Sequence, residues 1–193
     1  MMVSIASGPR VRRRPSIIPL PLILVPVGLK VRRRKRLRRK EAVSLLARLS
    51  RDFGIEVPDA DVPIDEAEAG VLRLLLSGDT PFAFVVGDAV GPTLRTLLAR
   101  PAHRRAVTVD MGAVPYIRNG ADVMAPGIVD ADPTIRAGDL VWIQDERNHR
   151  PLAVGRALMD GPTMAREERG KAIETVHHVG DDLWAFGEEG TGG

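Results

Sequence analysis

One short segment constrains the fold most, because its hydrophobic pattern switches from a strand to a helix within a few positions. Apolar and polar side chains alternate over residues 107–111, and a period of two predicts a strand. Gly112 and Ala113 follow, and their small side chains allow another surface to approach the backbone. Residues 113–118 are long enough for about one and a half helical turns, and Gly120 lies at the predicted stop. The pattern therefore predicts a tight corner between a strand and a helix.

This corner is a candidate binding site for a sugar-phosphate backbone. A second short strand is predicted at 121–124, before the turn signal Pro126-Gly127. Backbone N–H groups near a helix start can bind phosphate, and Arg118 can hold a phosphate through two hydrogen bonds. The glycines can equally serve the packing of the corner alone, and the residues leave both interpretations open. The candidates for the apolar wall of a base pocket are Met111, Val114 and Val123.

The same segment resembles the opening of a PUA domain, a small RNA-binding barrel. The resemblance rests on the sequences VDMGA, NGAD and APGI, which begin at Val109, Asn119 and Ala125. Matches to the later strands of that family follow in order, at 138–141, 155–158, 170–172 and 180–184. They cover roughly residues 105–186. The resemblance implies a barrel that binds structured RNA, often a tRNA or guide-RNA stem and its 3′ end, by shape rather than by sequence.

The N-terminal half carries mixed helix and strand signals. Residues 41–53 predict a helix that ends at Gly54. Apolar runs at 71–76 and 82–86 flank a Gly-Asp turn and predict a hairpin, although the first run could instead end a helix that starts near Ile64. The apolar face of the first helix consists of Ala42, Leu45, Leu46, Leu49 and Phe53.

Three further expectations concern the remaining segments. Residues 59–69 are acidic and are expected to be rich in turns. A second helix is expected to open at Gly91-Pro92-Thr93, with Leu94, Leu97 and Leu98 as its buried stripe. From residue 139 the chain is expected to form a meander of strands at 140–144, 152–159, 172–178 and 183–186.

The N-terminal pattern adds to the resemblance. TPFAFVVGD, then GPTLRTLL, then a PUA-like segment is similar to the archaeal relatives of the malignant-T-cell-amplified translation factor. That similarity implies an α+β fold, with an N-terminal α/β pre-PUA domain at 29–103 and a C-terminal PUA β-barrel (pseudobarrel) at 104–187. We expect residues 1–28 to be a disordered extension and 188–193 to be a tail. Four prolines interrupt the apolar run within 1–28, which argues against a signal peptide or a membrane span.

Charge is distributed unevenly along the 193 residues. Residues 1–40 hold 13 Lys and Arg and no acid, whereas the remaining 153 residues hold 15 basic and 25 acidic residues, a net of −10. Nine of the eleven residues at 30–40 are basic, with no acid among them to pair with. A basic block on an acidic body is typical of a nucleic-acid-binding arm. A solvated connector between a strand and a helix is the alternative.

The sequence shows no convincing catalytic constellation. It has no cysteine, which excludes disulfides, thiolate zinc sites and cysteine nucleophiles. Phosphate-loop, G-x-S-x-G and H-E-x-x-H motifs are missing. His177-His178 would point to opposite faces of a strand, and Asp181-Asp182 is expected to be a turn. We therefore predict no enzyme activity, no metal site and no cofactor.

We expect a non-catalytic, cytoplasmic RNA-binding protein that acts in translation or in ribosome function. The expected partners are tRNA or rRNA, the small ribosomal subunit or a translation-factor protein, and no membrane. The alternative is an accessory RNA-binding subunit of a tRNA- or rRNA-modifying enzyme, such as a pseudouridine synthase or archaeosine transglycosylase. The candidate RNA-binding residues are Met111, Gly112, Ala113, Val114, Arg118, Gly120, Ala121, Asp122, Val123, Arg104, Arg105, Lys171, Arg32, Arg33, Arg34, Lys35 and Arg36.

Overall fold

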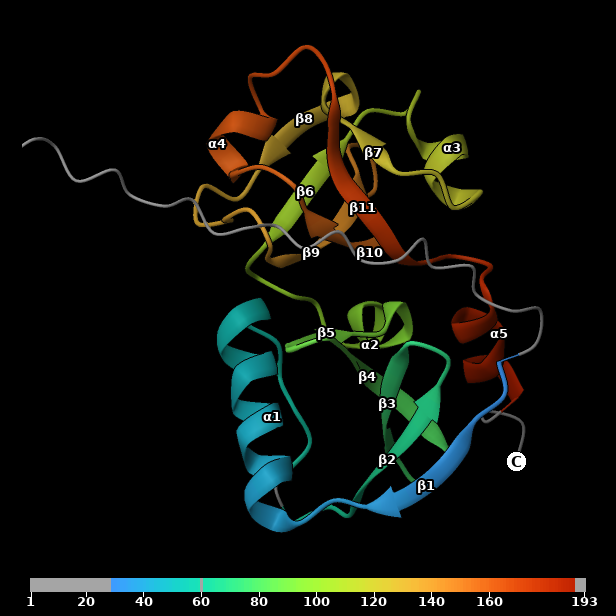
Figure 1. Cartoon of the computed structure of the whole chain (residues 1–193). Helices are drawn as coiled ribbons and strands as arrows, with labels where there is room; N and C mark the ends of the chain where they lie inside the picture. Colours follow the sequence, from blue (N-terminus) through green and yellow to red (C-terminus); the bar gives the residue numbers. More distant parts are fainter. Residues whose placement is uncertain (1–28, 60, 190–193) are drawn as a thin grey trace, which may run out of the picture.

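Two sheets lie one above the other in the computed structural model, which describes residues 29–59 and 61–189 (Figure 1). The first sheet has five strands in the order β1-β2-β3-β4-β5, and the second has six in the order β7-β11-β10-β9-β6-β8. This mixture of sheets and few helices confirms the expected α+β fold. The extension expected at 1–28 and residues 190–193 of the expected tail lie outside the described residues.

The elements follow the sequence in two groups. The first group contains β1 (Arg32–Arg36), α1 (Arg39–Phe53), β2 (Ile64–Ala69), β3 (Leu72–Ser77), β4 (Thr80–Val86), β5 (Ala89–Pro92) and α2 (Leu94–Ala99). The second group contains β6 (Ala106–Val109), α3 (Val114–Arg118), β7 (Val123–Met124), the 3₁₀ turn η1 (Ala125–Gly127), β8 (Ile128–Ala131), β9 (Leu140–Asp145), β10 (Pro151–Ala157), α4 (Gly161–Met164), β11 (Lys171–His178) and α5 (Asp182–Glu189).

Helix α1 and the β3–β4 hairpin confirm the predictions made for the N-terminal half. All five residues of the predicted apolar face of α1 are buried. Gly54 ends the helix with a left-handed backbone, φ +64°, and its N–H donates to the carbonyl of Ser50 at 2.7 Å. The alternative of a helix starting near Ile64 is wrong, because residues 64–69 form strand β2 instead. These acidic residues were expected to be rich in turns, so the strand was not predicted. Glu66 can be buried in the strand, at 4% exposed, because it pairs with Lys35 and Arg73.

Three further expectations are wrong. Pro92 ends β5 rather than opening α2; Thr93 caps that helix, and its side-chain oxygen accepts a hydrogen bond from the N–H of Thr96. Leu98 is 50% exposed and does not belong to the buried stripe. The segment at 183–186 is helical, not a strand, because Asp181 accepts the N–H of Trp184 at 2.8 Å and thereby caps α5.

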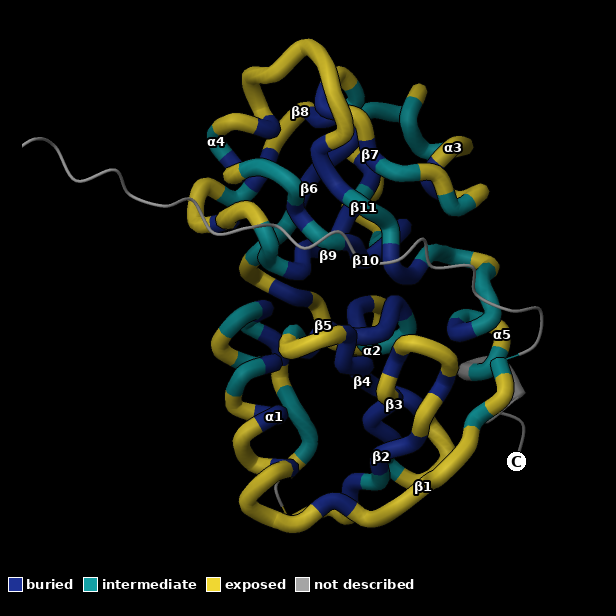
Figure 2. Tube along the Cα trace, viewed as in Figure 1, coloured by how far each residue is buried: buried dark blue, intermediate teal, exposed yellow. Residues whose placement is uncertain are grey.

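The apolar core of the first sheet continues into the second group of elements (Figure 2). The second-group residues buried in this cluster are Leu140, Trp142, Val154, Val176 and Leu183. A second cluster fills the barrel itself. The C-terminal helix α5 therefore returns toward the first sheet, and α2 lies between that sheet and strand β10. The two halves of the chain are joined by apolar packing, which fixes the direction in which the barrel faces.

A buried polar contact crosses the same joint. His177 is 1% exposed, and its Nε2 accepts the N–H of Leu94, the first residue of α2, at 3.2 Å. The other ring nitrogen, Nδ1, donates to the carboxylate of Asp181 at 2.8 Å. The two bonds assign the neutral ring with its proton on Nδ1. Burial raises the pKa of Asp181, but hydrogen bonds from His177, Trp184 and His178 outweigh burial and hold that pKa below its ordinary value.

A lowered pKa predicts a pH-dependent stability. The Asp181 carboxylate stabilises the fold above the unfolded-state pKa of about 4, and this contribution is lost as pH falls through the lower folded-state pKa. Asp181→Asn should lower the free energy of unfolding at pH 7 by about 1–3 kcal/mol, because buried donors lose their acceptor. Urea unfolding measures this difference, which should shrink below pH 4. A difference that stays constant from pH 7 to pH 3 would contradict the assigned role.

Candidate nucleic-acid interface

The loop between β6 and α3 is fixed by two carboxylates. Oδ1 of Asp110 accepts the N–H of Ala113 at 2.8 Å, and Oε1 of Glu146 accepts the N–H of Met111 at 3.0 Å. These N–H groups were candidates for holding a phosphate at the start of the helix. That expectation is wrong, because both donors already bind carboxylates and an incoming phosphate would meet two negative charges. The loop is a rigid support rather than a phosphate cradle.

The turn after α3 confirms that its glycine serves packing. Gly120 has φ +84°, and a Cβ built there would lie 2.8 Å from Nε2 of His178. Its neighbour Ala121 donates to the carbonyl of Tyr116 at 3.0 Å and accepts the hydroxyl of Thr175 at 2.9 Å. The turn is therefore held against β11, and α3 is fixed at one side of the barrel.

Two of the predicted site residues form an ion pair. Asp122 Oδ2 lies 2.6 Å from Nζ of Lys171, and the hydrogen bond that this amine donates to Asp122 raises its pKa. Asp122 also accepts the N–H of Thr175 at 2.9 Å. The positive charge of Lys171 is thus largely balanced within the fold. A ligand phosphate would have to compete with Asp122 for this amine.

The structure divides the other candidates between surface and core. Arg118, Gly112 and Ala121 are exposed, and Met111 is half-buried. Val123 is 0% exposed, so its prediction as part of a base pocket is wrong; strand alternation turns it into the barrel core. Val114 packs partly against the same core.

Two exposed residues in this region were missed from the sequence. Tyr116 on α3 is 69% exposed, and Met124 on the adjoining strand β7 is 50% exposed. A single tyrosine among apolar residues of a short helix is typical of a packed position. The fold shows that Ile117 takes the buried position instead. Exposed aromatic and thioether side chains offer a stacking face to bases.

The hairpin loop between β9 and β10 adds basic residues beside the site. The buried carboxylate of Asp145 accepts the N–H groups of Arg147, Asn148 and Arg150 at 3.0, 2.6 and 3.1 Å. Burial raises the pKa of Asp145, but these hydrogen bonds outweigh burial and lower it. Glu146, which lies between Asp145 and Arg147, accepts the N–H of Met111, so the loop lies next to the start of α3. The exposed residues of the loop include Arg147, His149 and Arg150.

Strand β1 corrects the expectation of basic residues without acidic partners. All five of its residues are exposed (Figure 2). Four of the five side chains pair with acids of β2 and of the turn between β3 and β4, far away in the sequence. The pairs are Arg33–Glu68 at 3.3 Å, Arg34–Asp65 at 2.8 Å, Arg34–Asp79 at 2.6 Å, Lys35–Glu66 at 3.2 Å and Arg36–Asp65 at 2.5 Å. The segment is an edge strand whose charge is largely balanced. It is a weaker candidate for RNA contact than its sequence indicates.

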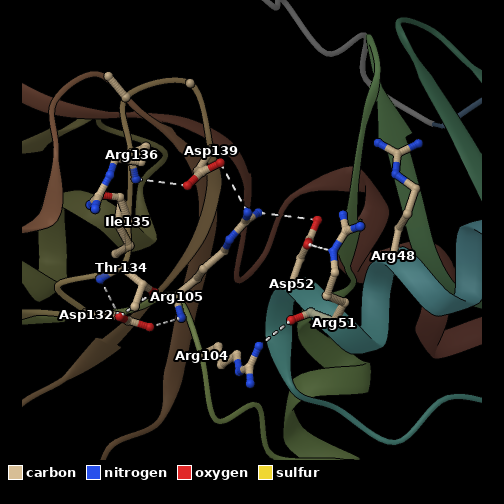
Figure 3. Close-up of polar contacts among 12 residues, drawn as sticks. Arg48, Arg51, Asp52, Arg104, Arg105, Asp132, Thr134, Ile135, Arg136 and Asp139 are labelled. Carbon is tan, nitrogen blue, oxygen red and sulfur yellow. Dashed lines mark hydrogen bonds and ion pairs between the residues drawn. The ribbon is translucent and has the colours of Figure 1, made fainter.

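Arg105 is a structural residue at the joint between the two sheets (Figure 3). Its guanidinium lies 3.2 Å from Asp139 and 3.6 Å from Asp52, and its backbone N–H donates to Asp132 at 2.6 Å. Its side chain is only 20% exposed. The expectation that it contacts RNA is corrected accordingly, because three carboxylates already hold it. Its neighbour Arg104 stays exposed.

Metal-binding clusters and membrane-spanning helices are absent from the described part of the chain. Among residues 29–59 and 61–189, no group of three or more His, Asp or Glu side chains is placed to hold a metal ion. None of the helices in these ranges is long and apolar enough to cross a membrane.

Comparison with known proteins identifies the family. The PUA domain model matches residues 105–179. A protein of Methanocaldococcus jannaschii is 46% identical over 114 residues, which are 59% of this chain and 70% of that protein. The chain belongs to the PUA-domain family. A crystal structure of a hypothetical protein from Pyrococcus horikoshii matches this PUA-domain chain with a TM-score of 0.70 and 38% identity, over 79% of this chain and 98% of that one.

Named relatives of this PUA-domain protein include a translation machinery-associated protein and a malignant T-cell-amplified sequence 1 homologue. Translation machinery-associated protein 20 of Saccharomyces cerevisiae is 32% identical, over 53% of this chain and 60% of that protein. A malignant T-cell-amplified sequence 1 homologue of Drosophila melanogaster is 33% identical, over 48% of this chain and 53% of that protein. The chain thus spans somewhat more than half of each of these two relatives.

The packing role of Gly120 gives a test with a matched control. Gly120→Ala and Gly170→Ala both place alanine at a left-handed backbone, with φ +84° and +93°, which costs about 1–2 kcal/mol. Only at Gly120 would the new Cβ also meet the ring of His178, whereas nothing lies within 4 Å at Gly170. Thermal unfolding should show Gly120→Ala to be less stable than Gly170→Ala by a further ~1 kcal/mol or more. Equal stabilities would show that His178 does not restrict this turn.

Proposed function

We propose that this PUA-domain protein binds structured RNA at the surface formed by α3 and β7, and that it acts in translation. The observation that carries the proposal is the exposure of Tyr116 and Met124 around a turn that is otherwise fixed by hydrogen bonds. Tyr116 and Met124 keep 69% and 50% of their surface exposed, which leaves a large apolar area free to contact a ligand. A rigid support with an exposed aromatic side chain suits a base that stacks outside a helical stem.

The chemistry of the surface fits the end of an RNA stem. Tyr116 provides a face for one unpaired base, and Arg118 follows it on the other side of the buried Ile117. Arg118 can bind a phosphate through two hydrogen bonds. The loop carrying Arg147 and Arg150 adds positive charge along the path of a backbone that passes Met111. We therefore propose the 3′ end of a tRNA acceptor stem as the ligand.

The proposal gives the two halves of the chain different roles. Residues 29–103 would form the pre-PUA domain and 104–187 the PUA domain that carries the RNA site. The translation-associated relatives support a partner in the translation machinery, and we propose the small ribosomal subunit. The hydrogen-bonded joint at His177 would keep the two domains in a fixed relation while the RNA is bound.

The test compares a tRNA with the same tRNA lacking its 3′ CCA, for the wild type and two variants. Tyr116→Ala should weaken binding of the intact tRNA roughly 5- to 150-fold, corresponding to about 1–3 kcal/mol per stacked base. Arg118→Glu should weaken it as well, through loss of a phosphate contact. Removing CCA should lower wild-type affinity and abolish most of the effect of Tyr116→Ala. Fluorescence anisotropy measures each dissociation constant.

Matched controls lie elsewhere on the same barrel. Val129 on β8 is an exposed apolar residue, and β8 lies at the opposite end of the strand order from β7. Arg166, which follows α4, is an exposed arginine. Val129→Ala and Arg166→Glu should leave tRNA affinity within about twofold of wild type. The proposal is overturned if Tyr116→Ala and Arg118→Glu bind intact tRNA as well as the wild type does.

A further inference from the structure

A group of five arginines, four of them exposed and one half-buried, lies where α1 meets the segment leading into the barrel. We call Arg48, Arg51, Arg100, Arg104 and Arg136 the junction arginines. They come from helix α1, from the chain after α2 and from the loop between β8 and β9. Figure 3 shows four of them around the Arg105 contacts, with Arg51 and Arg104 side by side. The group therefore spans both halves of the chain.

The hydrogen bonds of these arginines leave most of their charge unbalanced. Arg48 donates to the carbonyl of Asp88, Arg100 to that of Glu56 at 3.1 Å, and Arg104 to that of Arg51 at 3.1 Å. A carbonyl orients a guanidinium without neutralising it, and each guanidinium has five N–H donors. Arg51 differs, because it pairs with Asp52 at 2.8 Å.

A fourth junction arginine, Arg136 on the barrel, also donates to backbone carbonyls. Arg136 donates to the carbonyls of Pro133 and Ile135 at 3.0 and 2.9 Å. These bonds reduce the number of positions that a long side chain samples. Less conformational entropy is then lost when a phosphate binds.

Most of the acidic residues beside the junction arginines bind groups within the fold, and two are exposed. Asp52 and Asp139 have side-chain exposures of 15% and 26%, and both face Arg105. Asp132 accepts the N–H groups of Arg105 and Thr134. Glu56 and Asp88 are exposed acids at the rim. Four exposed arginines and the half-buried Arg48 lie beside two exposed acids, which gives this face an excess of positive charge.

A hollow adjoins one of the junction arginines, Arg100. A hollow of about 560 Å³ lies between the ends of α1 and α2 and is lined by Arg100, His103 and Glu56 among others. The backbone N–H groups of His103 and Arg104 both donate to the carbonyl of Phe53, at 2.9 and 3.1 Å. These hydrogen bonds hold His103, which lines the hollow, against the last turn of α1. Oriented guanidiniums with unbalanced charge beside a hollow suit contact with a chain of phosphates.

We infer that the junction arginines form a second RNA-binding surface, which contacts the phosphate backbone independently of base sequence. The inference rests on the proposed RNA-binding function and assigns a new contact to it. RNA held there touches both halves of the protein, while the α3 surface binds a different part of the same molecule. The basic residues of β1 do not take this role, because carboxylates pair with them.

The salt dependence of tRNA binding tests the inference. Each phosphate contact contributes about −0.7 to −0.9 to the slope of log K against log salt concentration. The triple variant Arg48→Gln, Arg100→Gln, Arg104→Gln, which changes only arginines that donate to carbonyls, should reduce the magnitude of that slope by about 2 to 3 and weaken binding about tenfold or more at physiological salt. The matched control is Arg33→Gln, Arg36→Gln, Arg39→Gln, which removes the same charge from arginines paired with Glu68, Asp65 and Asp61.

The outcomes separate this inference from the proposed function. A reduced slope in the junction variant, with an unchanged slope in the control, supports the inference. An unchanged slope in the junction variant, or an equal reduction in both variants, overturns it. If Tyr116→Ala still weakens binding in that case, the α3 site stands without the junction surface. Conversely, a reduced slope together with an ineffective Tyr116→Ala supports the junction surface and overturns the α3 site. Circular dichroism melting confirms that each variant is folded.

Discussion

The buried joint between the two sheets determines how every exposed surface of this molecule is presented. His177 accepts a hydrogen bond from the first residue of α2, and its ring is in turn held by Asp181, which also caps α5. Apolar side chains from β9, β10, β11 and α5 complete the core of the first sheet around this contact. At the other side of the joint, Arg105 connects Asp52 of α1 with Asp139 of the barrel. A rotation of the barrel would break apolar packing and buried polar contacts together.

That rigidity bears on the proposed RNA binding, because the protein has few aromatic residues. Aromatic residues make up 4% of the chain, so stacking is confined to single positions such as Tyr116. Recognition then depends on the shape of a fixed frame and on where unbalanced charge lies. Carboxylates pair with the basic residues of β1, whereas carbonyls orient most of the junction arginines. The same residue type therefore plays different roles, and the acceptor of each guanidinium distinguishes them.

The sequence predicted what local patterns control and missed what distant residues decide. The apolar stripe of α1, the β3–β4 hairpin and the corner around Gly120 follow from spacing and turn residues, and the structure confirms them. Strand β1 was missed because its acidic partners lie about thirty residues away on β2. The apolar residues of α5 suit a strand or a helix, and the cap from Asp181 decides between them. The exposure of Tyr116 and the buried role of Arg105 are likewise tertiary properties that spacing does not encode.

Ultraviolet crosslinking of a bound tRNA to the full chain, followed by mass spectrometry of the crosslinked peptides, tests the central claim most directly. The central claim is that RNA lies on the rigid α3 surface rather than on the basic edge strand. The account predicts crosslinks between the 3′ end of the tRNA and the peptide that contains Tyr116. Crosslinks of that end to residues 32–36, with none to residues 111–124, would contradict it.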